Sequence, residues 1–202
     1  MQQHSDLKST LQEKRAQMQS HKIVHQEILA HKSLVESVCL QAQQLIDQTQ
    51  DKSLSMYIVS IKQLFANIVS KSEELMDRST VCVKEHTLLT NSMTNFQDWL
   101  VAFRDETNIL ADTCGEKADT RKKLNGFNDV LVKNEMGRAQ LDDINQLCSL
   151  VVASTSPRGC DILHKMTLNL QDEVDSLTAG LRDTKTNLEV CPNILLNSQF
   201  NE

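Results

Sequence analysis

The stretch Asn95-Phe96-Gln97-Asp98-Trp99-Leu100-Val101-Ala102-Phe103 holds the only Trp and two of the five Phe of the chain. On a helix, Phe96, Trp99, Leu100 and Phe103 follow the spacing i, i+3, i+4, i+7, so they share one face. Aromatic side chains bury more area than their neighbours, and only 3% of the residues are aromatic. The stretch therefore predicts a helix that faces a core. The expected structural core consists of Phe96, Trp99, Leu100, Phe103, Phe127, Leu170 and Val174.

The composition of the whole chain is typical of long helices. Hydrophobic residues make up 40% of the 202 residues, and the chain has five Gly and two Pro, none of them before Gly115. An all-β fold needs turn residues every few positions, so this scarcity favours an all-α fold. We expect helices at about 10–48, 54–111, 116–152 and 158–190. The second should run unbroken through residues 70–90.

A few residues mark the expected helix ends. Asp51 is a candidate N-cap, and residues 113–116 combine a capping box with Gly115 as a helix terminator. Ser156 should cap the last helix, with Pro157 at its first helical position. The Ser156-Pro157 pair would also suit a proline-directed kinase, but the cap explains the same residues. Pro192 should stop the last helix.

The charge pattern argues against nucleic acid and membrane as partners. The net charge is −6, and its largest basic cluster is the short run 121–123. Nucleic acid and anionic membranes both require a concentrated basic face, which this pattern lacks. No apolar run reaches the ~18–20 residues that span a bilayer. The segment is expected to contact no membrane directly.

Residues that could carry chemistry are sparse. His21 and His25 stand at i, i+4, which suits a metal site on a helix, but no third ligand converges with them or with His31. The six cysteines have no CxxC spacing and look like reduced core residues of a cytosolic protein. Cys114 has no nearby base that would make it a nucleophile. We therefore expect that the chain is not an enzyme and that it binds no cofactor and no metal.

An internal repeat appears when the two halves are compared. Leu54, Ile61, Phe65, Ile68 and Leu75 are spaced 7, 4, 3 and 7, and the spacing 7, 4, 3 returns at Leu163, Leu170, Val174 and Leu177. The offset is 109 residues, and it also pairs Cys39 with Cys148. Two helices that agree on one offset indicate stacked helical repeats of three helices each.

The period, the three helices per unit and the Phe96-x-x-Trp99-Leu100 core resemble the spectrin-repeat family. The run Ile28-Leu29-Ala30-His31-Lys32-Ser33-Leu34-Val35 also looks like one often seen on the second helix of that family. The resemblance covers residues 10–190, although Val174 stands where the family often has Trp. Cysteine-rich repeats of low aromatic content look most like those of the nesprins, giant proteins of the nuclear envelope.

The resemblance implies an elongated rod of tandem three-helix bundles joined by a continuous helix. It implies a non-catalytic linker or scaffold that connects the actin cytoskeleton to the nuclear envelope, at the cytoplasmic face of the outer nuclear membrane. Helical segments, a formin or another actin regulator would be partners of such a segment. Actin and SUN-domain proteins would be bound by other parts of the full-length chain. The alternative is a regulatory helical module of a signalling protein, such as an exchange factor or a kinase anchor.

The offset also predicts where the domains lie. Residues 1–83 would be an incomplete repeat with helices B and C, residues 84–192 a complete repeat, and residues 193–202 a tail. A repeat that lacks one helix leaves an apolar groove, which the missing segment, a second copy or a partner helix would cover. The residues expected to line this partner groove are Met18, Ile28, Val35, Ile61, Phe65 and Ile68.

Overall fold

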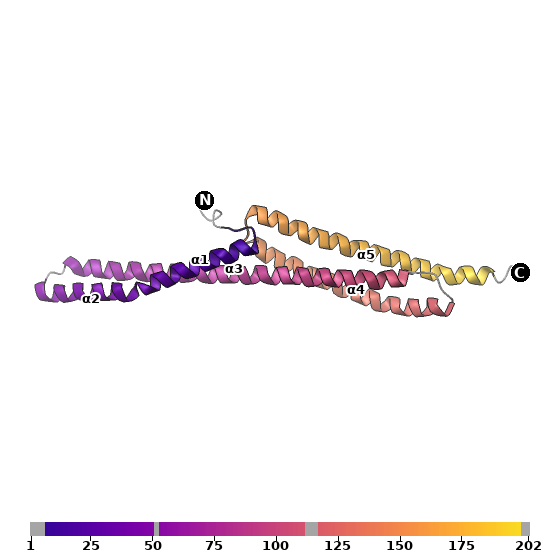
Figure 1. The fold of residues 1–202 in the computed structure, drawn as a ribbon, viewed down its shortest axis with the longest axis horizontal. Coiled ribbons are helices and arrows are strands. Elements are labelled where there is room, and N and C mark those ends of the chain that lie inside the picture. Colours follow the sequence, from indigo (N-terminus) through magenta and orange to yellow (C-terminus); the bar gives the residue numbers. More distant parts are fainter. Residues whose placement is uncertain (1–6, 51–52, 112–116, 199–202) are drawn as a thin grey trace. The chain divides into compact units, whose positions relative to one another are not determined.

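Every regular element in the part of the chain that the structure describes is an α-helix. The computed structural model describes residues 7–50, 53–111 and 117–198. The elements are α1 (Leu11–Ala30), α2 (Lys32–Thr49), α3 (Ser53–Ala111), α4 (Lys117–Val152) and α5 (Pro157–Ser198), shown in Figure 1. The all-α prediction is confirmed. The candidate cap at Asp51 and the signals at 113–116 lie outside the described residues.

Helix α3 is a single helix of 59 residues, as the lack of Gly and Pro predicts. It runs through residues 70–90 without a break, so the predicted continuous join is confirmed. The chain divides into two compact units, Met1–His86 and Thr87–Glu202, and α3 contributes to both. The boundary expected between the two repeats lies after residue 83.

The first predicted helix is two helices, and this prediction was wrong. A break at His31 separates α1 from α2. The Nδ1 atom of His31 lies 2.7 Å from the carbonyl oxygen of Glu27, four residues earlier. The side chain thus competes for a carbonyl that the helix would use for its own hydrogen bonds, a recognised cause of helix kinks.

The last helix is longer than predicted. Helix α5 begins at Pro157, and the Oγ atom of Ser156 accepts a hydrogen bond from the N–H of Gly159 at 3.5 Å, as the expected cap requires. It then continues to Ser198, so Pro192 does not end it. A proline removes one backbone hydrogen bond, and a helix can bend at that point rather than stop.

In the C-terminal unit, the end of α3 packs with α4 and α5 around one long core. Six of the seven expected core residues are buried there, and Trp99 is only partly buried. One cluster surrounds Leu89, Phe96 and Leu100; the next joins Phe103 to Phe127 and Leu181. Trp99 packs against both clusters but lies one residue before the buried Leu100, at the rim of the core.

The Trp99 ring sits between two phenylalanines and directly on a glycine. Its ring centroid is 5.3 Å from that of Phe96 and 4.7 Å from that of Phe103, and both pairs are stacked. A Cβ atom on Gly137 of α4 would lie 2.6 Å from Cζ3 of the indole and 2.8 Å from Cζ2. Gly137 therefore leaves the space that the indole fills.

Gly137→Ala should destabilise the C-terminal unit by up to about 2 kcal/mol. Alanine favours a helix by about 1 kcal/mol over glycine, but the clash with Trp99 should cost about 1–3 kcal/mol and outweigh that gain. Gly180→Ala is the matched control, because a Cβ atom there has no neighbour within 4 Å. Urea unfolding should show Gly180→Ala stabilised by up to about 1 kcal/mol. Equal effects of the two changes would show that the indole does not rest on Gly137.

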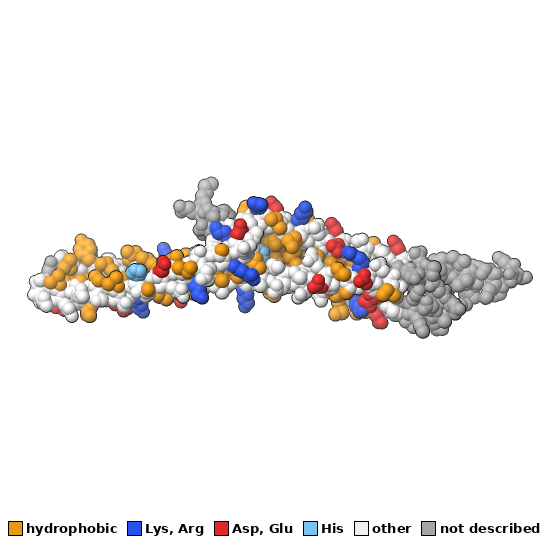
Figure 2. All heavy atoms as spheres, viewed as in Figure 1, with side chains coloured by type: hydrophobic (Ala, Val, Ile, Leu, Met, Phe, Trp, Pro, Cys, Tyr) orange, Lys and Arg blue, Asp and Glu red, His pale blue; other side chains and the backbone are white. Residues whose placement is uncertain are grey.

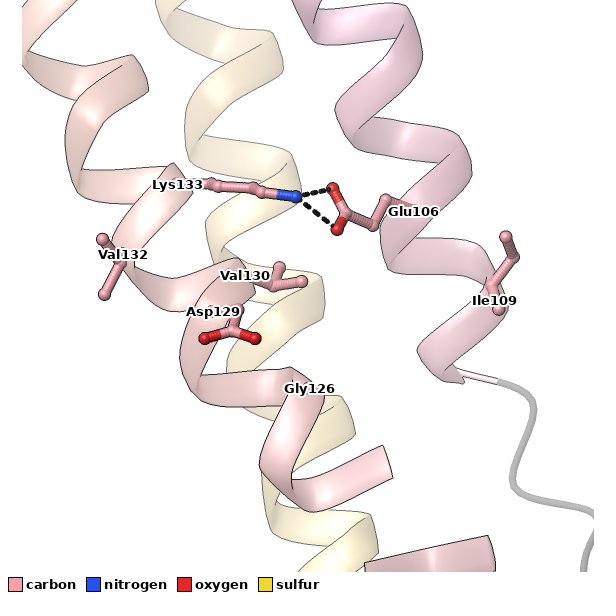
Figure 3. A pocket seen from close by; sticks show the side chains of 7 residues that line it. All are labelled: Glu106, Ile109, Gly126, Asp129, Val130, Val132 and Lys133. Carbon is pink, nitrogen blue, oxygen red and sulfur yellow. Dashed lines mark hydrogen bonds and ion pairs between the residues drawn. The ribbon is translucent and has the colours of Figure 1, made fainter. Parts of the chain in front are cut away.

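Polar pairs tie the three helices of this unit together at the surface. Lys133 of α4 contacts both carboxylate oxygens of Glu106 on α3, at 2.6 and 2.8 Å, beside a shallow pocket (Figure 3). Arg104 of α3 contacts Glu173 of α5 at 2.8 Å. All four side chains are substantially exposed, so each pair contributes at most about 1 kcal/mol.

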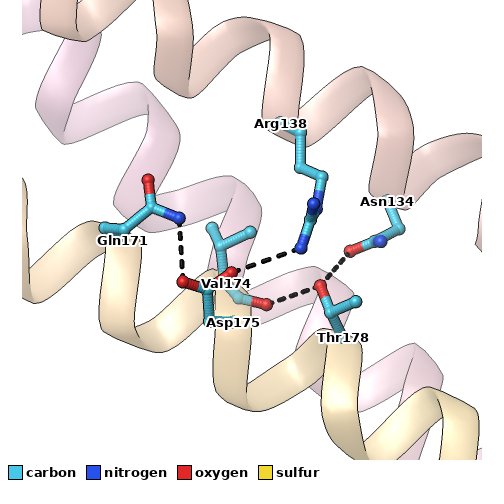
Figure 4. A network of polar contacts seen from close by, with 6 residues as sticks. All are labelled: Asn134, Arg138, Gln171, Val174, Asp175 and Thr178. Carbon is cyan, nitrogen blue, oxygen red and sulfur yellow. Dashed lines mark hydrogen bonds and ion pairs between the residues drawn. The ribbon is translucent and has the colours of Figure 1, made fainter.

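A partly buried network joins α4 to α5 (Figure 4). The Thr178 hydroxyl shares its one hydrogen between two acceptors, Asn134 Oδ1 at 3.1 Å and the Val174 carbonyl oxygen at 2.7 Å. Beside it, Asp175 accepts hydrogen bonds from Arg138 at 3.2 Å and from Gln171 at 2.9 Å. Because Asn134 and Thr178 are buried, this pair fixes the register of the two helices.

Candidate functional site

The N-terminal unit is an antiparallel hairpin in which α1 and α2 pack against the first part of α3. His21 pairs with Ser79 and His25 with Ser72, so residue numbers rise on one side as they fall on the other. A small apolar cluster of Cys39, Ile46 and Ile58 closes the far end. The candidate site lies on this hairpin, where the partner groove was expected.

The structure does not bring the six expected groove residues onto one seam. Met18, Ile28, Val35 and Phe65 are partly buried between the helices. Ile61 and Ile68 are 47% and 42% exposed and lie outside the seam. The prediction of a shared seam was therefore wrong for these two residues.

The true seam of α3, the row of its residues that faces α1 and α2, follows alternating steps of three and four residues from Phe65 onward and mixes apolar with polar side chains. It includes Ile58, Phe65, Val69, Ser72, Met76, Ser79, Val83 and His86, all buried or partly buried. The offset of 109 residues pairs the buried cysteines Cys39 and Cys148 correctly. It also pairs Leu170, 2% exposed, with Ile61, so it fails for the last helix.

Two histidine–serine pairs form the polar part of the seam. His21 Nδ1 lies 2.6 Å from Ser79 Oγ, and His25 Nδ1 lies 2.8 Å from Ser72 Oγ. Each serine hydroxyl already donates its hydrogen to a carbonyl of its own helix, Leu75 or Val69. The serine oxygen must therefore accept, and each histidine donates from Nδ1. These histidines act as links between helices.

His86 and Lys14 lie at the end of the same seam. Both are buried, at 5% and 3% exposure. Burial, and to a smaller extent the charge of Lys14, lower the pKa of His86 from 6.5 to about 4. The folded unit therefore holds His86 neutral at pH 7.

Acid should destabilise this unit through His86. The unfolded chain binds a proton near pH 6.5 and the folded chain only near pH 4, so stability falls as pH drops through that window and levels off below it. The total loss should be about 3 kcal/mol, from about 1.4 kcal/mol per pKa unit. His86→Leu should flatten the fall relative to the parent chain, while exposed His164→Asn should leave it unchanged. Identical pH profiles for the parent chain and His86→Leu would contradict this assignment.

A groove opens on one side of the hairpin. It has a volume of about 590 Å³, and its floor includes the seam residues Val35, Cys39, Phe65 and Val69. Its walls come from residues one position after the seam on both helices: Leu29, Glu36, Ala66, Ser70 and Glu73. Lys32 and Lys62 line it as well, so this side carries both acidic and basic groups.

The opposite side of the hairpin is apolar. We call it the open face, and it consists of the large apolar residues one position before the seam on α2 and α3; Gln41 and Lys71 stand in the same rows. Each of the apolar residues is between 37% and 67% exposed. The open face is formed by Leu34, Val38 and Leu45 of α2 and by Leu54, Tyr57, Ile61, Leu64, Ile68 and Leu75 of α3.

The described residues contain no cluster suited to holding a metal ion. No group of three or more His, Cys, Asp or Glu side chains converges in the ranges 7–50, 53–111 and 117–198. Cys114 lies outside those ranges. None of the described helices is long and apolar enough to span a bilayer.

The chain matches no family model. It is 39% identical, over 176 residues, to "Muscle-specific protein 300 kDa" of Drosophila melanogaster. The match covers 87% of this chain but 1% of that relative. The chain is thus similar to one short stretch of a far longer muscle protein.

Proposed function

We propose that the chain is a non-catalytic structural and docking segment of a cytoskeletal scaffold. The similarity to 1% of a very long muscle protein carries the proposal, because a segment of that kind contributes length and binding surface. Two helical units that share the unbroken helix α3 fit this role. Stacked helical units of this type transmit spacing along a chain through their nearest neighbours.

The finer proposal is that the full-length protein is nesprin-like. It would link actin to the nuclear envelope from the cytoplasmic side, with actin and SUN-domain proteins bound outside residues 1–202. Formins or other actin regulators would be partners of the helical surfaces. The resemblance of the Phe96–Phe103 helix and of residues 28–35 to spectrin repeats supports this proposal.

Proximity labelling tests it. A labelling enzyme would be fused after residue 202 within the full-length protein in muscle cells, and residues 1–202 fused to the same enzyme would be the control. Actin-associated proteins and proteins of the outer nuclear membrane should be enriched over the control. Enrichment of a signalling enzyme and its substrates would instead support the regulatory-module alternative.

A further inference from the structure

The open face is large for a protein surface that stays in water. At about 200 Å² for a fully exposed large residue, its nine side chains expose on the order of 900 Å². The largest apolar patch on a typical monomer covers about 300–600 Å². In Figure 2, hydrophobic side chains are seen to gather over α2 and the first part of α3.

Both rows of the open face lie on one side of the hairpin. Each row precedes the seam by one residue, a rotation of about 100° around its helix. The helices are antiparallel, so the two rotations turn toward the same side. The groove supports this geometry, because residues one position after the seam on both helices line it together.

The C-terminal unit shows how much of the corresponding side of the α4–α5 pair is covered by one further helix, the end of α3. There, Lys133 and Glu173 lie one residue before the buried Asn134 and Val174, and they reach the third helix through Glu106 and Arg104. These positions form the rim and carry charge.

Apolar residues in that rim row remain in water despite the third helix. Ile162 and Met166 precede the buried Leu163 and Thr167, and they are 46% and 41% exposed. A single helix therefore leaves this row half exposed. In the N-terminal hairpin the corresponding rows hold no charged residue between Leu34 and Leu45 or between Leu54 and Ile68. Covering them requires a layer wider than one helix.

We propose that the open face is a self-association surface. The open face of a second copy packs on it, so that the two hairpins together form a four-helix bundle. Two rows that point about perpendicular to the hairpin plane suit the square arrangement of a four-helix bundle. An isologous contact places identical patches against each other, and the rows from Leu34 to Leu45 and from Leu54 to Ile68 bring no like charges together there. The exposed area of on the order of 900 Å² per copy matches the ~800 Å² that each partner buries in a standard stable interface.

Sedimentation equilibrium of residues 1–202 under reducing conditions tests the proposal. The parent chain should be a dimer that dissociates on dilution. Val38→Lys with Leu64→Lys places two charges on the open face and should weaken dimerisation by about 100-fold or more. The control is Leu40→Lys with Val59→Lys on the opposite side. Leu40 and Leu64 are equally exposed, at 61%.

The result shows which molecule covers the open face. A dimer that the open-face variant dissociates and the control variant preserves supports the second copy. A parent chain that is monomeric at ~100 µM, well above the Kd of a standard-size interface, would overturn the proposal and leave another helical segment, of this protein or of a partner, as the occupant. Equal weakening by both variants would also overturn it. Because no cytoskeletal partner takes part, this result is independent of the labelling experiment.

Discussion

Cys82→Pro is expected to cost about 3 kcal/mol or more and to separate the unfolding of the two units. Residue 82 lies in the middle of α3, close to the boundary between the two units at His86 and Thr87. Proline there removes a backbone hydrogen bond, and its ring clashes with the preceding turn. Urea unfolding followed by far-UV circular dichroism should show a lower first midpoint and two resolved transitions.

Cys82→Ala is the control for this experiment. Cys82 is only partly buried, and alanine is the best helix former, so its effect should stay within about 1 kcal/mol. A proline variant as stable as the alanine variant would show that residues near 82 are not helical in solution.

Trp99→Ala is expected to cost about 3 kcal/mol, at the low end of the range for large-to-small changes in a core. The indole is partly exposed at the rim, but it stacks on Phe96 and Phe103 and packs against both core clusters. The change should also reverse the effect of Gly137→Ala. Once the indole is gone, alanine at 137 should stabilise the helix.

Val101→Ala is the matched control, because Val101 lies on the same helix and points to solvent. Its effect should be within about 0.5 kcal/mol. If Trp99→Ala cost no more than Val101→Ala, the aromatic stack would not anchor the unit.

The core of the C-terminal unit could be predicted from the sequence because its apolar spacing and its burial coincide. Phe96, Leu100 and Phe103 lie on one helical face and are buried together. The unbroken course of α3 was equally predictable, since no Gly or Pro interrupts it. Local sequence decides both features.

The seam of the N-terminal unit could not be found from apolar spacing. Helix α3 carries two rows, and the one with Ile61, Leu64 and Ile68 is more apolar than the seam with Ser72 and Ser79. Choosing the more apolar row moves the expected seam by one residue. The i, i+4 spacing of His21 and His25 was a signal of the polar part of the seam, but it was considered only as a metal site, which the sequence did not support.

Two other features were visible in the sequence but not predicted. Thr10 and Glu13 form a capping box at the start of α1, with Thr10 Oγ1 accepting from the Glu13 N–H at 3.2 Å. The spacing Thr-x-x-Glu is its usual signature. Gly137, by contrast, interrupts a helical pattern for a reason that only the position of Trp99 supplies.

The central claim is that one unbroken helix joins the two units. Hydrogen exchange of the backbone amides of residues 70–90, in residues 1–202 at neutral pH, tests it most directly. The structure predicts slow exchange at every amide of this range, with no gap between the seam residues and the Trp99 core. A run of several unprotected amides anywhere between residues 70 and 90 would contradict the account.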